Sequence, residues 1–211
     1  MSLTLEAART AALFIDFQVD VCGAGGRMVR QDASVLDRFQ AARDQAARLL
    51  QHVREVPGVF VVHVVHLFDP GYPELAGAHL HGMFRTVMSQ GAFVQGSAGA
   101  AVVPELAPRE GETLLRKTSI SVFETTDLDV RLRRRDVATV VICGVVTHYA
   151  VLGATLSASD RGYRVVVPED GCSSGSTERH ESALAVMQPL AEVTRVDDVI
   201  AALNPASAAA R

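Results

Sequence analysis

The feature of this chain that most constrains its fold is the alternation of short β-branched runs with longer segments of helical periodicity. Six largely apolar runs predict strands at 11–16, 58–67, 113–117, 138–144, 163–169 and 191–196. Most of these runs are continuously apolar, which is typical of strands that are covered on both faces. Helical spacing of apolar residues predicts helices at 33–54, 147–161 and 176–188.

Strands that alternate with helices predict an α/β fold with an open parallel sheet. The 211 residues suit one domain, because the chain contains no repeat, linker or composition shift. A tail from about residue 205 is expected to be frayed. Ligands of such sheets bind beyond the carboxyl ends of the strands. The candidate functional residues therefore lie where predicted strands end, at 16–18, 66–69, 117, 144–150 and 169–172.

The composition indicates a cytoplasmic protein that acts on a small molecule. A net charge of -4 with 21% charged residues does not indicate a nucleic-acid or membrane-surface ligand. The one basic run, 131–136, is expected on a solvated helix face. We expect no signal peptide at the start of the chain, and no apolar run reaches the roughly 18 residues of a membrane span. Three cysteines without paired spacing, Cys22, Cys143 and Cys172, are expected to be reduced thiols.

Two of the predicted strands end in charged residues that could perform acid–base chemistry. Asp16 follows a buried apolar run, where poor solvation raises the proton affinity of a carboxylate and suits it to proton transfer. Lys117 ends another strand and could keep a nearby carboxylate charged or stabilise an anionic transition state. The alternatives are a turn-forming aspartate and a surface lysine.

A third strand end, 144-GVVTHYAVLGAT-155, has the form of a strand, a sharp turn at Gly144 and a helix. Backbone amides at a helix start can receive a developing oxyanion, and the helix dipole lowers the pKa of a thiol in the first turn. The position that would hold such a nucleophile is Ala150. Thr147 offers a hydroxyl but no evident partner base, and it suits a helix cap.

Together these segments resemble the isochorismatase-like cysteine hydrolase superfamily, which includes nicotinamidases, carbamoylsarcosine amidohydrolases, ureidoacrylate and biuret hydrolases, and isochorismatases. The resemblance extends from about Ala11 to about Leu203. The matching motif residues, in chain order, are Asp16, Gln18 and Asp20; Lys117, Ser121, Phe123, Thr126 and Leu128; Gly144, Val145 and Thr147; Gly162 and Tyr163; and Asp170 and Cys172.

The resemblance implies a six-stranded parallel sheet with helices on both faces, no cofactor, and a homodimer or homotetramer. It implies that Asp16 is the general base, that Lys117 is its partner and that Ala150 occupies the nucleophile position. It also implies a cis peptide between Val145 and Val146, which would aim the amides of Val146 and Ala150 at the substrate oxygen. Neighbouring residues are expected to bind the substrate, namely Phe17, Gln18, His66, Thr147, His148 and Tyr149.

Ala150 leaves three hypotheses open. In the first, the chain is a cysteine amidase whose nucleophile has been replaced. In the second, it is an isochorismatase-type enzyme, in which the aspartate is thought to protonate a vinyl ether and no nucleophile is needed. In the third, the pocket only binds its ligand. The other cysteines are not expected to replace the missing thiol, although Cys22 could approach the pocket.

The histidines after the second predicted strand do not predict a metal site. Nicotinamidases of the superfamily hold a metal with an Asp-x-His pair in this region, and no such pair follows 61-VVHVVH-66. His63 and His66 lie three residues apart, so they should face opposite sides of a strand, whereas a metal needs three or four converging ligands. The excursion at 68–97 is expected to cover the active site. Within it, Arg85 is either a contact for an anionic substrate or a surface residue.

Overall fold

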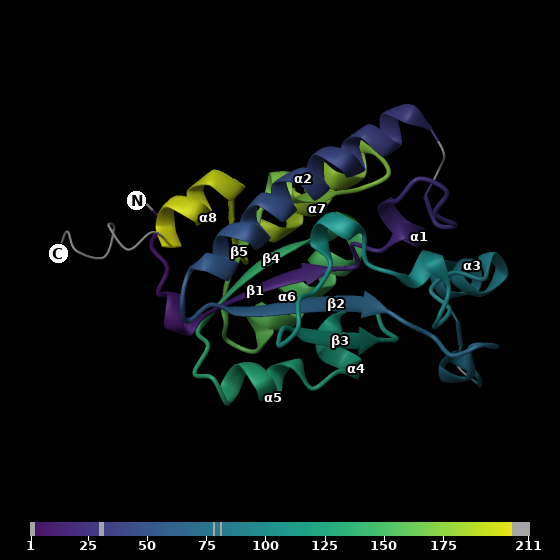
Figure 1. Cartoon of the computed structure of the whole chain (residues 1–211), viewed down its shortest axis with the longest axis horizontal. Helices are drawn as coiled ribbons and strands as arrows, with labels where there is room; N and C mark the ends of the chain where they lie inside the picture. Colours follow the sequence, from purple (N-terminus) through teal and green to yellow (C-terminus); the bar gives the residue numbers. More distant parts are fainter. Residues whose placement is uncertain (1–2, 30–31, 78, 81, 204–211) are drawn as a thin grey trace.

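The computed structural model describes residues 3–29, 32–77, 79–80 and 82–203. Its sheet has the strand order β3-β2-β1-β4-β5-β7, and every pairing is parallel (Figure 1). These six strands are β1 (Thr10–Ile15), β2 (Phe60–His66), β3 (Thr113–Lys117), β4 (Thr139–Val145), β5 (Arg164–Pro168) and β7 (Glu192–Thr194). The predicted parallel α/β fold is therefore confirmed, with all six predicted strands present.

The sheet also contains a short strand that the sequence did not predict. β6 (Cys172–Ser173) pairs with Gly144 and Val145 at the end of β4, so the sheet has seven strands. Two residues are too few to produce a recognisable periodicity. This strand fixes the segment after β5 beside the turn that follows β4.

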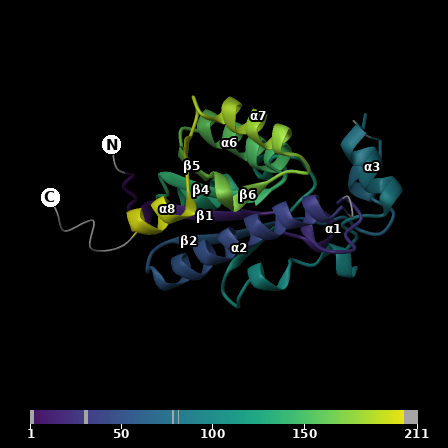
Figure 2. The same cartoon turned by 90° about the horizontal axis from the view of Figure 1, so that it is seen from above.

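Helices cover both faces of the sheet. One core contains α2 (Ala33–Glu55) and α8 (Val196–Leu203), and the other contains α4 (Val122–Thr125), α5 (Leu128–Arg133), α6 (Leu152–Asp160) and α7 (Thr177–Met187). β1 shows why its sequence is continuously apolar: Ala12 and Phe14 enter the first core, and Leu13 and Ile15 enter the second. Figure 2 shows α6 and α7 side by side.

The predicted helices at 33–54 and 176–188 are present with nearly the expected limits. The Asp32 side chain accepts a hydrogen bond from the Ser34 amide at the start of α2. Ser176 likewise caps α7 by accepting from the Arg179 amide. The helix predicted at 147–161 begins differently, with a wider π-helical turn over Thr147–Val151 before α6.

The excursion between β2 and β3 lies beyond the carboxyl ends of the central strands. It contains α3 (Gly82–Gln90), which the sequence analysis did not predict. In Figure 1, α3 lies with the short α1 (Val19–Cys22) past the tips of β1 and β2. None of the described helices is long and apolar enough to span a bilayer. The tail expected from about residue 205 lies outside the described residues.

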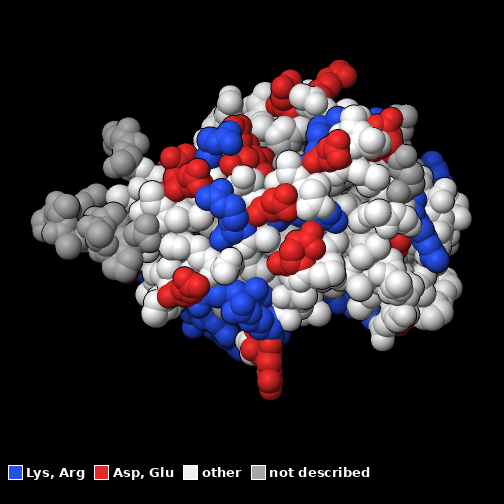
Figure 3. Space-filling model, turned by 45° about the horizontal axis from the view of Figure 1, so that its top comes forward, with Lys and Arg blue, Asp and Glu red and all other residues white. Residues whose placement is uncertain are grey.

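The basic run at 131–136 is only partly helical. α5 ends at Arg133, and the following residues form a turn. Arg131 pairs with Asp127 at 2.8 Å, and the Arg135 guanidinium lies 4.1 Å from the centre of the Phe60 ring. The face in Figure 3 carries acidic and basic side chains interspersed, with one basic cluster at its lower edge. The predicted solvated helix face therefore accounts for the first half of the run only.

Candidate active site

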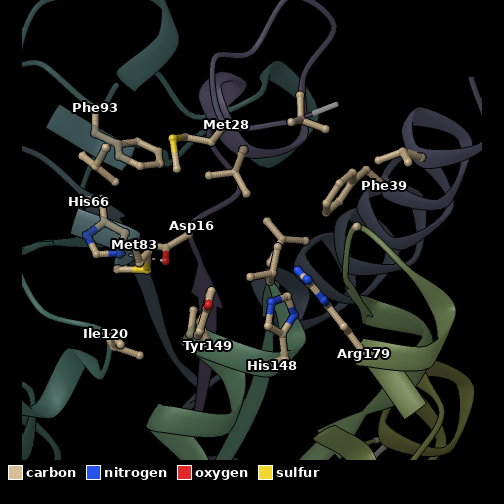
Figure 4. Close-up of a pocket in the computed structure, with 18 of the residues that line it drawn as sticks. Asp16, Met28, Phe39, His66, Met83, Phe93, Ile120, His148, Tyr149 and Arg179 are labelled. Atoms are coloured by element: carbon tan, nitrogen blue, oxygen red, sulfur yellow. Dashed lines mark ion pairs between the residues drawn. The ribbon is translucent and has the colours of Figure 1, made fainter. Parts of the chain in front are cut away.

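A cavity of about 490 Å³ opens at the carboxyl ends of the central strands (Figure 4). Its walls include eight residues from the predicted strand ends: Asp16, His66, Lys117, Val145, Val146, His148, Tyr149 and Ala150. The remaining wall is formed largely by apolar side chains, among them Met28, Val35, Phe39, Met83, Phe93 and Ile120. Most of the candidate residues thus converge on one cavity.

Asp16 presents a buried carboxylate to this cavity. The six residues of β1 are all buried, and the chain turns directly after them with Asp16 in the left-handed region at φ 58°. The Asp16 Oδ2 atom lies 2.8 Å from Lys117 Nζ and 3.5 Å from His66 Nε2. The other oxygen, Oδ1, has no hydrogen-bond partner among the described residues. One carboxylate oxygen is therefore held by the protein while the other is available to a ligand.

Lys117 is held beside Asp16 by the sheet itself. The register of β2 and β3 pairs His66 with Lys117, and β2 lies next to β1. The lysine is fully buried, and its ammonium also donates to the Ile120 carbonyl at 2.9 Å. Its third neighbour is His66 Nε2, at 3.0 Å. With the Ser119 carbonyl at 3.4 Å the ammonium has four partners, and Lys117 is not a surface lysine.

Burial shifts the proton affinities of this cluster. Desolvation raises the pKa of Asp16, and the charge of Lys117 opposes that rise. Desolvation lowers the pKa of Lys117, while Asp16 opposes that fall. Burial and the nearby ammonium hold the pKa of His66 well below its usual value, so His66 is neutral at pH 7. The proton affinities of Asp16 and Lys117 are drawn together, which suits a proton-transfer site.

The turn after β4 forms the facing wall. The Val145–Val146 peptide bond is cis. Ala150 is 3% exposed and borders the cavity, but its amide already donates to the Val146 carbonyl at 3.0 Å. This corrects the expectation that the Ala150 amide points at a substrate oxygen. The corresponding role of the Val146 amide remains a prediction.

His148 and Tyr149 both border the cavity, as expected of substrate-binding residues. His148 Nδ1 lies 2.9 Å from Ser174 Oγ, which ties the turn to the segment after β6. Burial and the charge of Arg179 lower the pKa of His148, so the ring is neutral at pH 7. Tyr149 is 42% exposed and lies against His148, with 4.4 Å between the ring centroids.

Three residues expected to contact substrate are not among the described residues that line the cavity: Phe17, Gln18 and Thr147. Gln18 is fully buried, and its side chain bonds to both the amide and the carbonyl of His66 and to the Ala100 carbonyl, each at 2.8 Å. Thr147 Oγ1 is paired with His180 Nδ1 at 2.8 Å. Phe17 is packed in the core. Burial and internal hydrogen bonds explain why none of them faces a ligand.

The sequence analysis missed two charged residues of the cavity wall, Glu178 and Arg179, and weighed a third, Arg85, that lies elsewhere. Arg179, in the first turn of α7, borders the cavity. Arg85 does not appear in the described wall, and its guanidinium donates to the Leu80 carbonyl at 3.0 Å. Arg179 lies beyond any strand end, so the strand-end criterion could not find it. Only the start of the predicted helix at 176–188 pointed to this part of the chain.

The three cysteines are buried thiols outside the described cavity wall. Burial raises the pKa of Cys22 and of Cys172 to about 12, and it raises that of Cys143 well above the usual value of a thiol. Cys22 donates to the Gln18 carbonyl at 3.3 Å and does not reach the cavity. None of the three can supply a thiolate near Ala150.

His63 and His66 have separate environments, as their spacing predicted. His63 lies 2.9 Å from Glu112 and stacks on Phe14, on the side of the strand away from the Asp16 cluster. Within the described ranges, no group of three or more histidine, cysteine, aspartate and glutamate side chains is arranged to hold a metal ion.

The family model of the isochorismatase domain matches residues 10–198, which include β1 and the turn after β4. The chain belongs to the isochorismatase family. Members of this family are hydrolases, and some relatives of this chain are named as amidohydrolases.

The chain is similar to several family members. It is 31% identical over 119 residues to an uncharacterized isochorismatase family protein, YecD, of Escherichia coli O157:H7, covering 52% of this chain and 63% of that protein. It is 31% identical over 144 residues to maleamate amidohydrolase of Pseudomonas putida, covering 68% and 65%. Both alignments span less than two thirds of the curated relative. A solved isochorismatase family protein from Desulfovibrio vulgaris is 29% identical, with a TM-score of 0.77 and coverage of 92% and 98%.

Proposed function

We propose that this isochorismatase-family chain is built to cleave the C–N bond of a small amide or ureido compound, with a cysteine acting at the position that Ala150 occupies. The observation that carries the proposal is the buried ion pair of Asp16 and Lys117, at 2.8 Å, in the same cavity as Ala150. The similarity to maleamate amidohydrolase, over 68% of this chain, supports the same reaction class.

The proposed reaction uses Asp16 twice. With a cysteine at position 150, the free oxygen of Asp16 takes the thiol proton, and the thiolate attacks the amide carbon. The proton then passes to the leaving nitrogen as the C–N bond breaks, leaving a thioester. Asp16 next takes a proton from water, the hydroxide attacks the thioester carbon and the C–S bond breaks to release the acid. Asp16 then returns its proton to the departing thiolate and restores the thiol. Lys117 keeps Asp16 charged at the start of each half-reaction.

The Ala150 chain itself lacks the atom that would form the thioester. No other cysteine borders the described cavity, so the chain as it stands should bind the substrate without acylation. Alanine removes only the sulfur, and the walls that would hold the substrate are otherwise intact. In this form the protein is a binding pocket with the acid–base pair still in place.

A second reaction is compatible with Ala150 itself. Burial raises the pKa of Asp16, which favours a carboxyl group that can donate a proton. A nucleophile-free isochorismatase-type hydrolysis needs such a donor to protonate a vinyl ether. Its substrate is a dianion, and Arg179 and Lys117 are cations of the cavity wall. This reaction is therefore the second candidate for the chain with alanine at position 150.

The decisive experiment compares the chain with its Ala150→Cys variant. Both are assayed for release of ammonia from small amides and ureido compounds, and for hydrolysis of isochorismate. An Ala41→Cys variant, with a thiol on an exposed part of α2, controls for the chemistry of an added cysteine. Activity of Ala150→Cys alone supports the cysteine amidase. Activity of the unchanged chain on isochorismate supports the second candidate, and silence of all three proteins contradicts both.

A further inference from the structure

The charged groups of the cavity wall are not all paired with one another. Among the described wall residues, Asp16 and Lys117 neutralise each other in their ion pair. His66 and His148 are neutral at pH 7, because burial lowers the pKa of both. The other charged wall residues are Glu178 and Arg179, which follow each other in the first turn of α7. Whether the Arg179 guanidinium is free to pair with a ligand therefore depends on whether these two groups form an ion pair.

Glu178 does not neutralise Arg179. Consecutive residues of a helix project about 100° apart and do not face each other. No carboxylate among the described residues forms an ion pair with Arg179, whereas Arg164 pairs with one carboxylate and Arg195 with two. In Figure 4 the Arg179 side chain extends from α7 past His148 toward the interior of the cavity. Arg179 thus presents an unpaired cation to whatever occupies the cavity.

The position of Arg179 is set by the start of α7 and by the packing of that helix. The Arg179 amide donates to the Ser176 cap, which sets the first turn of α7. α7 packs against α6 and against the turn at Thr147–Val151. Thr147 and His180 join the turn to the same helix by a 2.8 Å hydrogen bond. Arg179 and Ala150 are therefore carried by elements that are braced against each other.

The two ends of the cavity differ in chemistry. Asp16 and His66 lie at one side in Figure 4, and Arg179 lies at the other beyond His148. Lys117 belongs to the Asp16 side, because its Nζ is 2.8 Å from the Asp16 carboxylate. Apolar side chains form much of the remaining wall. A ligand that satisfies both ends carries a reactive carbonyl at one end and an anionic group at the other. The planar guanidinium matches a carboxylate, which it can bind through two parallel hydrogen bonds.

We propose that the substrate is a small amide or ureido acid whose carboxylate pairs with Arg179 while its amide carbon lies over position 150. The amide end of this inference rests on the proposed function, and the carboxylate end rests on Arg179 alone. Neutral amides of the same size are poor ligands, because they leave the Arg179 charge unpaired.

The test measures binding and turnover separately. The probes are pairs that differ only in charge: the monoamides of three- to five-carbon dicarboxylic acids against their diamides, and N-carbamoyl-β-alanine against its amide. Binding to the unchanged Ala150 chain is measured by calorimetry, and turnover is measured in the Ala150→Cys variant. Each is repeated with Arg179→Ala, Arg179→Lys and the control Arg85→Ala, whose guanidinium lies outside the described wall.

The expected result is that at least one acid binds the unchanged chain more tightly than its neutral partner. Arg179→Ala should weaken that binding by about tenfold to a hundredfold, the range for hydrogen bonds to a charged group, and leave the neutral partner unaffected. Arg179→Lys should retain part of the preference for the acid over its neutral partner, and Arg85→Ala should retain all of it. Added salt should reduce this preference, because it screens the charge–charge interaction.

Two outcomes separate this inference from the proposed function. Turnover of neutral and anionic amides by Ala150→Cys with equal kcat/KM, unchanged by Arg179→Ala, overturns the carboxylate site and leaves the amidase. Absence of turnover with Arg179-dependent binding of the acids overturns the amidase and leaves the anion site. If no acid binds better than its neutral partner, the inference is wrong.

Discussion

At the scale of the residue, the chemistry depends on where Asp16 keeps its proton. We expect Asp16→Asn in the Ala150→Cys background to lower kcat by about a hundredfold to ten-thousandfold, because an amide cannot accept the thiol proton. Asparagine has nearly the same shape, so the melting temperature checks that the fold is intact. Asp16→Asn is a cleaner change than loss of Lys117, which would leave a buried carboxylate without its counterion.

The same two measurements, kcat and melting temperature, can also contradict the proposed role of Asp16. If Asp16→Asn retains most of the activity of the parent variant, proton transfer by Asp16 is not part of the reaction. Gln40→Leu, a change to an exposed side chain of α2 that bonds to Asp44, provides a matched loss of a polar group that is not part of the described cavity wall. It should leave kcat unchanged.

Individual site residues were predictable from sequence to the extent that they follow strands. Asp16, Lys117 and Ala150 lie on the cavity wall, as the carboxyl-end rule and the motif together indicated. Gln18 follows a strand but does not line the cavity, because its side-chain amide is hydrogen-bonded to the backbone of His66. Arg179 was missed because its direction depends on the phase of α7 and on how that helix docks. Neither the phase of α7 nor its docking can be derived from the local pattern of apolar residues.

At the scale of the element, the periodicity of apolar residues predicted the length and type of most helices and strands better than it predicted their local conformation. Strands buried on both faces left continuous apolar runs, and α2 left a clear helical stripe. The π-helical turn at Thr147–Val151 was invisible, because one wider turn barely changes the spacing of apolar residues. α3 was missed because it has only nine residues and buries only Phe84 and Val87, so its helical periodicity extends over little more than two turns.

The joint between β4 and the following turn requires a glycine. A Cβ added to Gly144 would lie 2.9 Å from the Ile15 carbonyl oxygen and 3.2 Å from Val151 Cγ2. We therefore expect Gly144→Ala to lower the free energy of unfolding by about 1–3 kcal/mol, the usual cost of overpacking. Urea denaturation measures the change.

Gly82→Ala is the matched control for this prediction. A Cβ at Gly82 meets no heavy atom within 4 Å, and alanine favours the helix that begins there. Its stability should be unchanged or slightly higher. If Gly144→Ala is as stable as this control, β1 and β4 can separate without cost, and the close approach does not constrain the site.

At the scale of the whole molecule, the site is a consequence of topology. The chain proceeds from β1 outward to β2 and β3, then returns to place β4 on the other side of β1. A crevice forms outside the carboxyl ends of the two strands where the order reverses. Asp16 follows β1 and Ala150 follows β4, so the acid–base group and the nucleophile position lie on opposite sides of that crevice. Lys117 reaches it from β3 because its long side chain passes beside β2.

A second charged cluster ties the layers together away from the cavity. Glu112, just before β3, accepts two hydrogen bonds from Arg54 of α2, at 2.7 and 2.8 Å, and one from the Arg109 amide at 2.8 Å. His63 of β2 lies 2.9 Å from the same carboxylate. The Arg54 and Glu112 side chains are 11% and 13% exposed. Although burial opposes the shift, these contacts lower the pKa of Glu112 to about 2.

This cluster makes stability depend on pH in a defined direction. The pKa of Glu112 is lower in the folded chain than in the unfolded chain, so its contribution is complete above about pH 4.5. It is lost as the pH falls toward 2. At pH 7, Glu112→Gln should cost about 2–3 kcal/mol of unfolding free energy, and the difference from the parent chain should shrink progressively below pH 4.5. Urea midpoints at pH 7, 4 and 3 measure it, with exposed Glu110→Gln as the control. A difference that stays constant over this range would mean that hydrogen bonding, not charge, is what Glu112 contributes between α2 and the sheet.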